Sequence, residues 1–310
     1  MLLSSLWPPV ALLLAGAPGA VGDAAEAIDP PANEDIIKAT QGRDQRLTVP
    51  VSIAGHGPFD FLVDTGAQAT VVTGGVVDRL GPLERGRAML VGMASRRVVD
   101  TVEVDGLVLG SRIFDNLTSP VLDARHVGAD GIIGLDSLQD QRVLLDFKTN
   151  TLTVSDAKSL GGNRGFEIIV KARRKLGQLV ITDAVIDGIR TAVIVDTGSQ
   201  ATVGNLSLQS RLRQRRGPDS VMTDVTGATM TGRISTTELI SMGNVHMRGV
   251  SITFADAPPF ASLGFSKKPA LILGMRDLRL FDRVAIDFAS RQILFDLPRG
   301  ARTVRQGFLD

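Results

Sequence analysis

Two aspartates stand at the ends of matching apolar runs and are the residues most suited to chemistry. Asp64 follows Phe61-Leu-Val and begins Asp-Thr-Gly-Ala-Gln-Ala-Thr-Val, and Asp196 follows Val193-Ile-Val and begins Asp-Thr-Gly-Ser-Gln-Ala-Thr-Val. Each apolar run is typical of a buried strand, and the glycine that follows marks a turn. Two carboxylates that face each other share one proton. Such a pair could hydrolyse an amide, because the ionised partner takes a proton from water while the other donates to the carbonyl oxygen.

The residues directly after these aspartates indicate how the pair would be held. Gly66 and Gly198 permit the tight turn that exposes each carboxylate and leaves its backbone N–H open. The hydroxyls of Thr65 and Thr197 could lock the two loops together and hold the carboxylates in one plane. The sequence therefore predicts two equivalent loops that meet.

The two stretches differ at the residue after the glycine, which is Ala67 in one and Ser199 in the other. A hydroxyl at Ser199 could donate a hydrogen bond to the charged form of Asp196 and lower its pKa. We therefore expect Asp196 to be the ionised partner and Asp64 to hold the proton.

The repeat continues downstream of each aspartate. Gly131-Ile-Ile-Gly134 follows the first, and Leu271-Ile-Leu-Gly274 follows the second at a similar separation. Each segment is followed by a strand-like run that ends in Asp-Phe, at Val143–Phe147 and at Val284–Phe288. Several landmarks in the same order indicate shared architecture, so the chain has two equivalent halves.

The secondary-structure pattern is that of an all-β protein. Short alternating runs such as Leu47–Ile53 are separated by turns marked by glycine, as at Asp187–Gly188. Short helices are expected at Gly74–Leu80 and at Leu206–Arg215. There is no βαβ rhythm and no phosphate-binding glycine loop.

These signals divide the chain of 310 residues into parts. The first lobe is expected at 46–157 and the second at 166–298. The stretch 158–165 contains Gly161-Gly162 and is the best candidate for a linker, and 299–310 is a polar tail.

The N-terminus predicts export. Residues 1–22 have a short apolar core followed by small residues, which fits a secretory signal peptide although the usual basic start is missing. The alternative is a retained membrane anchor, but the apolar run is short for spanning and prolines interrupt it. Residues 23–45 show no clear period and are expected to be a mobile leader. The mature chain is then exported, to the periplasm or outside the cell, and has no stable membrane span.

Composition excludes several classes of function. The net charge of +1 gives no electrostatic footprint for nucleic acid. Cysteine does not occur, which excludes disulfides, thiolate metal sites and a cysteine nucleophile. The three histidines, His56, His126 and His246, are scattered, so we expect neither a metal site nor a cofactor.

Two basic runs, Lys171–Lys175 and Arg211–Arg216, are expected to be solvated faces. The alternative is contact with an anionic envelope surface or an acidic substrate.

The paired Asp-Thr-Gly motifs, each with a later apolar-apolar-Gly segment, resemble those of the aspartic peptidases. More narrowly, they resemble bacterial retropepsin-like proteins that carry two such domains in tandem. The resemblance covers roughly residues 46–298. It implies two retropepsin-like or pepsin-like lobes related by a pseudo-twofold axis, with a catalytic cleft between them. It also implies catalytic roles for Asp64 and Asp196 and a supporting role for Gly134 and Gly274.

The resemblance further implies a β-hairpin flap in each half that closes over a peptide. Tyrosine does not occur in the chain, so the flap tyrosine of the pepsin branch is impossible, which favours the retropepsin branch. The candidate flaps are Val91–Ser95 and Thr226–Thr229. Their candidate substrate-binding residues are Gly92, Met93, Ala94, Gly227, Ala228 and Thr229.

The resulting hypothesis is an aspartic endopeptidase that acts on extended segments of a protein or peptide substrate. One chain could carry a complete site as a monomer, although a homodimer in which each lobe pairs with its counterpart is also possible. Two further alternatives are an inactive exported peptide-binding module and a structural envelope protein whose halves pack without bringing the aspartates together.

Overall fold

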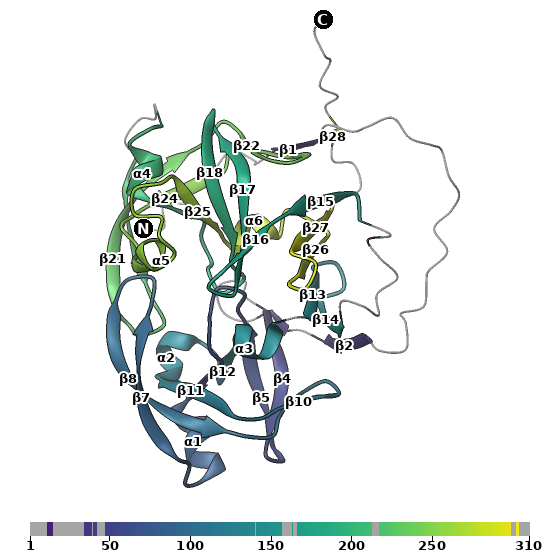
Figure 1. Cartoon of the computed structure of the whole chain (residues 1–310), viewed down its shortest axis with the longest axis vertical. Coiled ribbons are helices and arrows are strands. Elements are labelled where there is room, and N and C mark those ends of the chain that lie inside the picture. The colour runs from purple at the N-terminus through teal and green to yellow at the C-terminus, as the bar shows by residue number, and fades with distance from the viewer. Residues whose placement is uncertain are drawn as a thin grey trace, which may run out of the picture.

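Strands dominate the computed structural model, where they form three sheets (Figure 1). The structure describes residues 11–14, 34–38, 40–41, 47–139, 141–156, 163, 166–212, 217–298 and 302–303. One sheet belongs to each half of the chain, and the third joins the two halves. The expected all-β fold with two lobes is confirmed.

The first lobe is built on a sheet that has ten strands among the described residues, in the order β10-β9-β4-β5-β12-β6-β11-β8-β7, with β3 paired to β4. Three short helices, α1 (Gly74–Leu80), α2 (Ala124–Val127) and α3 (Leu135–Leu138), lie between its strands. The strands are β3 (Thr40–Gln41), β4 (Leu47–Ile53), β5 (His56–Val63), β6 (Val71–Thr73), β7 (Arg85–Val91), β8 (Arg96–Val104), β9 (Leu107–Leu109), β10 (Arg112–Phe114), β11 (Leu117–Leu122) and β12 (Gly131–Ile133).

The second lobe repeats this plan in the order β20-β21-β24-β19-β25-β18-β17-β22-β23-β1-β28, with β16 paired to β17. Its helices are α4 (Leu206–Gln209), α5 (Pro258–Ser262) and α6 (Met275–Leu278). Its strands are β1 (Ala11–Leu14), β16 (Arg173–Lys175), β17 (Gln178–Ile186), β18 (Ile189–Val195), β19 (Val203–Gly204), β20 (Asp219–Thr223), β21 (Thr229–Thr236), β22 (Ile240–Met242), β23 (Val245–Arg248), β24 (Ser251–Phe254), β25 (Ala270–Leu273) and β28 (Arg302–Thr303).

Tight hairpins bring the motif strands into these sheets. Asp187 and Gly188, with φ of 45° and 83°, connect β17 to β18, which confirms the turn expected there. Ala54 and Gly55, with φ of 48° and 80°, connect β4 to β5 in the same way. Two consecutive positive φ values suit the twist of a two-residue hairpin. The same kind of two-residue turn therefore precedes both motif strands.

The third sheet joins the lobes in the order β15-β27-β26-β13-β14-β2. Its centre is the antiparallel pair of β13 and β26, one strand from each half. The predicted Asp-Phe runs are therefore the strands through which the two halves pair. The bounds are β2 (Glu34–Lys38), β13 (Gln141–Asp146), β14 (Thr151–Asp156), β15 (Ile168–Lys171), β26 (Arg283–Asp287) and β27 (Gln292–Asp296).

Buried apolar residues form one large cluster through both lobes and the joining sheet. Two smaller clusters lie apart from it. One belongs to the second lobe and includes Val203, Phe260 and Leu263. The other belongs to the first lobe and includes Leu122 and Val127.

Two boundaries differ from the sequence predictions. Part of the expected mobile leader 23–45 is strand, because β2 pairs with the open edge of β14 and β3 pairs with β4. A five-residue strand is too short to show a period in sequence. The helix expected at Leu206–Arg215 ends at Gln209, and residues 213–216 lie outside the described part of the chain.

Most of the terminal predictions lie outside the described residues. Within the expected signal segment 1–22 only Ala11–Leu14 is described, as a strand paired with β23. Residue 163 is described in the expected linker 158–165, and 302–303 in the tail. No helix in the described ranges is long and apolar enough to cross a membrane. Export stays a prediction.

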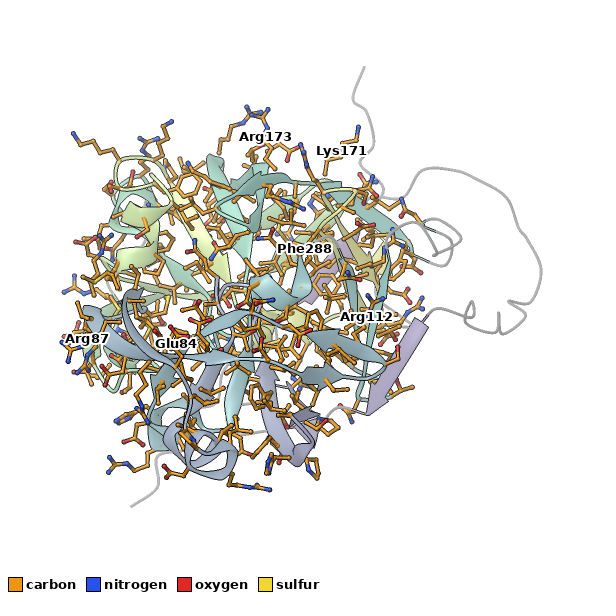
Figure 2. All side chains as sticks on the ribbon, turned by 60° about the horizontal axis from the view of Figure 1, so that its bottom comes forward. Glu84, Arg87, Arg112, Lys171, Arg173 and Phe288 are labelled. Carbon is orange, nitrogen blue, oxygen red and sulfur yellow. The ribbon has the colours of Figure 1, made fainter. Side chains whose placement is uncertain are left out.

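The basic run Lys171–Lys175 lies on the outside of the second lobe. Lys171 and Arg173 are exposed and extend away from the molecule in Figure 2. Arg174 donates to the Phe288 carbonyl at 2.8 Å. Lys175 lies 4.5 Å from the centre of the Phe265 ring. The run is thus partly a solvated face and partly bound to its own lobe.

Candidate active site

Asp64 and Asp196 occupy equivalent places at the ends of central strands. Asp64 directly follows β5, and its N–H donates to the carbonyl of Ile133 in β12 at 3.1 Å. Asp196 directly follows β18, and its N–H donates to the carbonyl of Leu273 in β25 at 3.1 Å. The apolar residues before each aspartate are buried. The motif strands are therefore those that the sequence predicted.

Each carboxylate is fixed by its own loop. Asp64 Oδ1 accepts from the N–H groups of Gly66 at 2.7 Å and Ala67 at 2.9 Å. Asp196 Oδ1 accepts from those of Gly198 at 2.9 Å and Ser199 at 3.1 Å. Oδ2 accepts none of these four bonds in either aspartate.

The two aspartates meet across the junction between the lobes. A Cβ built on Gly66 would lie 2.6 Å from Asp196 Oδ2, and one built on Gly198 would overlap the Asp64 carboxylate. Real Cβ atoms do not come so close to other heavy atoms, so each glycine of one lobe makes room for the aspartate of the other. The structure brings the predicted pair together in a single chain.

Thr65 and Thr197 lock the two loops to each other. The Thr65 N–H donates to Thr197 Oγ1 at 3.0 Å, and the Thr197 hydroxyl donates to the Val63 carbonyl at 2.7 Å. The reciprocal bonds run from the Thr197 N–H to Thr65 Oγ1 at 3.2 Å and from the Thr65 hydroxyl to the Val195 carbonyl at 3.0 Å. Both threonines are buried. The expected lock is present in the structure.

Thr197→Val is expected to lower the free energy of unfolding by about 1–3 kcal/mol, because it leaves the buried Thr65 N–H and Val63 carbonyl unpaired. Thr197→Ser keeps the hydroxyl and serves as the matched control. Denaturant unfolding of both variants measures the effect. Equal stability of the valine and serine variants would show that the lock does not stabilise the lobes.

Gly134 and Gly274 support the two loops from behind. The Gly134 N–H donates to Thr70 Oγ1 at 3.1 Å, and the Gly274 N–H donates to Thr202 Oγ1 at 3.2 Å. A Cβ on either glycine would lie 2.5 Å from loop backbone, at Ala69 in the first lobe and Ala201 in the second. These glycines allow a strand to pass directly beneath each loop.

An aspartyl protease family model matches the chain in two regions, residues 49–137 and 182–276. Together they cover more than half of the chain, and each contains one Asp-Thr-Gly motif and one of the supporting glycines. The chain belongs to the aspartyl protease family. The match in two regions agrees with a tandem arrangement of two retropepsin-like domains.

In this member of the aspartyl protease family, the pKa of Asp196 lies well above its usual value of 3.8. Burial is the main cause, followed by the charge of Asp64 and a hydrogen bond with it, while the N–H groups of Gly198 and Ser199 act in the opposite direction. The two aspartates therefore form a coupled pair that shares a proton, and the raised pKa of Asp196 favours its protonated form. The direction is opposite to the lowered pKa that was expected for Asp196 from the Ser199 hydroxyl.

The Ser199 hydroxyl does not form the bond to Asp196 that the sequence predicted. That hydroxyl donates to the Ala201 carbonyl at 2.9 Å, and only the backbone N–H of Ser199 reaches Asp196. A serine hydroxyl often bonds to backbone close in sequence, and here that local bond takes the only proton it can donate.

The two predicted flaps are the turns of hairpins. Gly92, Met93 and Ala94 lie in the turn between β7 and β8. Gly227 and Ala228 lie in the turn between β20 and β21, and Thr229 is the first residue of β21. Figure 1 shows the β7–β8 hairpin of the first lobe reaching toward the end of β21. Contact of these residues with a substrate stays a prediction.

Three residues at the site were missed by the sequence reasoning. Asp136 accepts from the Thr70 hydroxyl at 2.7 Å, and Asp277 accepts from the Thr202 hydroxyl at 2.5 Å. An aspartate two or three residues after each supporting glycine was the signal for them. Gln178 in β17 donates to the Gly66 carbonyl in the other lobe at 2.5 Å, and no motif marks it.

Among the described residues, no three His, Asp or Glu side chains gather as a bound metal ion would require. The arrangement at the junction is one of two carboxylates, backbone N–H donors and hydroxyls. Carboxyl groups placed in this way can accept and donate protons.

Proposed function

We propose that this aspartyl protease family member is an endopeptidase that hydrolyses peptide bonds in extended segments of proteins, with water activated between Asp64 and Asp196. The observation that carries the proposal is the close approach of each motif glycine to the opposite carboxylate. Two carboxylates on interlocked loops converge there, and one of them is disposed to hold a proton. One chain supplies both groups.

The chemistry follows from the shared proton. Asp64 accepts a proton from water, whose oxygen bonds to the peptide carbonyl carbon, while Asp196 protonates the carbonyl oxygen. Collapse of the resulting diol breaks the C–N bond. The proton on Asp64 passes to the leaving nitrogen, and a hydroxyl proton of the diol returns to Asp196. The pair ends with the charge that it had at the start.

The geometry of the site contradicts one alternative function and is compatible with another. A structural protein whose halves pack without bringing the aspartates together is wrong, because the cross-lobe glycine contacts require them to meet. A module that captures peptides without cleaving them shares the same geometry and is distinguished by turnover. The pH dependence of turnover is the most direct test.

The rate of cleavage of an unstructured protein is expected to follow a bell-shaped pH profile. At low pH both aspartates are protonated and no base remains, whereas at high pH both are ionised and no acid remains. Because the pKa of Asp196 is raised above 3.8, the upper limb lies at higher pH than an ordinary aspartic acid would give. Initial rates from acid to neutral pH measure the profile. Peptide binding without turnover at every pH would instead indicate the capture module.

A further inference from the structure

The tips of the two flap hairpins are bonded to each other through one carboxylate. Asp224, in the turn after β20, is only 7% exposed. Its Oδ2 accepts from the Ala94 N–H at 3.0 Å and from the Ser95 hydroxyl at 2.9 Å, both in the other hairpin. Its Oδ1 accepts from the N–H and the hydroxyl of Thr226 at 2.9 and 2.6 Å, and from the Ala228 N–H at 3.2 Å. One oxygen holds its own turn, and the other is bonded to the opposite flap.

This contact breaks the symmetry of the repeat. Asp224 follows the last residue of β20, and Gly92 follows the last residue of β7 in the equivalent place. A Cβ on Gly92 would overlap Asp224 Oδ2. One flap therefore carries the carboxylate, and the other has the glycine that makes room for it.

Each flap tip also packs against the opposite lobe. Met93 of the first lobe contacts the smaller apolar cluster of the second, which includes Phe260 and Leu263. Val225 of the second lobe contacts the smaller apolar cluster of the first, which includes Val127. The carboxylate thus joins two tips that already cross the junction in opposite directions.

Two arginines at the start of β8 form further hydrogen bonds between the lobes. Arg96 Nη2 donates to Ser262 Oγ in α5 at 2.9 Å, and Arg97 Nη1 donates to the Thr226 carbonyl at 3.3 Å. Both bonds run from the first flap to the second lobe. Neither involves the Asp224 carboxylate, whose five donors are neutral.

We propose that Asp224, with Ala94 and Ser95, forms a flap latch that must separate to admit a peptide and that re-forms to position the peptide at the Asp64–Asp196 pair. The part of this inference that concerns the peptide rests on the proposed function. Asp224 is then a positioning residue. It holds the hairpins and does not take part in proton transfer.

The charge state of Asp224 agrees with such a latch. Burial raises its pKa, but hydrogen bonds from Thr226, Ala94 and Ser95 outweigh that effect, so the pKa lies below the usual value. Hydrogen bonds to an ionised acceptor are stronger than those between neutral groups. Asparagine in place of Asp224 would have only one side-chain oxygen. Its NH₂ group would face N–H or O–H donors and could not accept their hydrogen bonds.

Labels on the outer faces of the hairpins can test the latch without turnover. The chain has no cysteine, and Met89 and Val221 are 63% and 69% exposed. Spin labels on the double variant Met89→Cys/Val221→Cys therefore report the separation of the flaps without competing thiols. We expect one narrow distance distribution in the otherwise unchanged chain. Asp224→Asn should broaden it and lengthen its mean, with about a 10- to 100-fold rise in the ratio of separated to joined tips.

Two further variants keep the test specific. Ser95→Ala removes one cross-flap donor and leaves the bonds of Asp224 to its own turn intact, so it should shift the distribution in the same direction even if Asp224→Asn does not fold. Asp219→Asn is the matched control on the same hairpin, because the Asp219 side chain lies in an exposed ion pair with Arg233 at 3.5 Å. The control should leave the distribution unchanged. A folded Asp224→Asn or Ser95→Ala variant with the original distribution would overturn the latch.

Kinetics separate this proposal from the proposed function. If the chain is a peptidase, Asp224→Asn and Ser95→Ala should raise KM more than they lower kcat and should leave the bell-shaped pH profile in place. Distances that respond in a chain with no cleavage at any pH would support the latch and contradict the peptidase. Unchanged distances in an active enzyme would contradict the latch alone.

Discussion

Asp64→Asn and Asp196→Asn are each expected to lower kcat for peptide hydrolysis by about 10²- to 10⁴-fold, the usual contribution of a positioned general acid or base. The proposed reaction needs one ionised and one protonated carboxyl group at the same time. An amide in place of Asp64 cannot accept the proton of water, and one in place of Asp196 cannot protonate the carbonyl oxygen. Loss of either aspartate should therefore cost about as much as loss of both.

The free energy of unfolding distinguishes the loss of a reacting carboxyl group from a failure to fold. Two carboxylates in contact repel each other when both are ionised, so replacing one with an amide should not lower the free energy of unfolding. Asp78→Asn, at an exposed position of α1, is the matched control and should retain full activity. Cleavage that survives in either active-site variant would contradict a shared pair and indicate a contaminant or a site that forms between chains.

The facing pair of aspartates could be predicted because its signals are local and occur twice. A buried strand, an aspartate and a glycine in each half place a carboxylate at a turn, and the repeat then requires a twofold relation between the halves. Gly134 and Gly274 follow the same logic, since each lies where backbone must pass close to a loop. Local pattern and symmetry together were sufficient for the fold and for the position of the aspartates.

The remaining features depend on contacts that no local pattern records. Asp224 is bonded to Ala94, which is 130 residues away, and its role depends on the glycine at the equivalent place in the other half. Gln178 reaches the Gly66 carbonyl across the lobes in the same way. The expected bond from the Ser199 hydroxyl to Asp196 does not form because that hydroxyl donates to the Ala201 carbonyl. Differences between the two copies would have been the best signal for these asymmetric contacts.

Strands β13 and β26, which join the lobes, show how a difference between the two copies of the repeat leads to an asymmetric contact. The run Arg-Val-x-x-Asp-Phe occurs twice, and antiparallel pairing sets Arg142 opposite Asp287 and Arg283 opposite Asp146. Arg142 forms a buried ion pair with Asp287 across the lobes, with Nε 2.9 Å from Oδ2. Arg283 instead bonds to Asp296 within its own lobe at 2.7 Å.

The strand that pairs with each arginine within its own half explains which carboxylate the arginine binds. Arg283 lies opposite Asp296 on β27, whereas Arg142 lies opposite Ser155 on β14. An arginine with a carboxylate directly beside it in its own hairpin is neutralised there. Since Arg142 has serine in that place, its guanidinium pairs with the carboxylate of the other lobe. This difference between the two copies thus accompanies the buried ion pair of Arg142 and Asp287 at the junction.

Arg142→Met is expected to lower the free energy of unfolding by about 3–5 kcal/mol, because it leaves the fully buried Asp287 carboxylate without a cation. The double variant Arg142→Met/Asp287→Leu should recover a large part of this loss, since no unpaired charge remains. Denaturant unfolding of the single and double variants measures the coupling between the two side chains.

An exposed ion pair supplies the control for this prediction. Arg87 lies 3.3 Å from Asp100 on the first flap, and the two side chains are 77% and 64% exposed. Arg87→Met should therefore change the free energy of unfolding by no more than about 1 kcal/mol. If Arg142→Met cost as little as Arg87→Met, the buried pair would not stabilise the joining sheet. Backbone pairing and apolar packing would then be what holds the two lobes, and with them the two aspartates, in register.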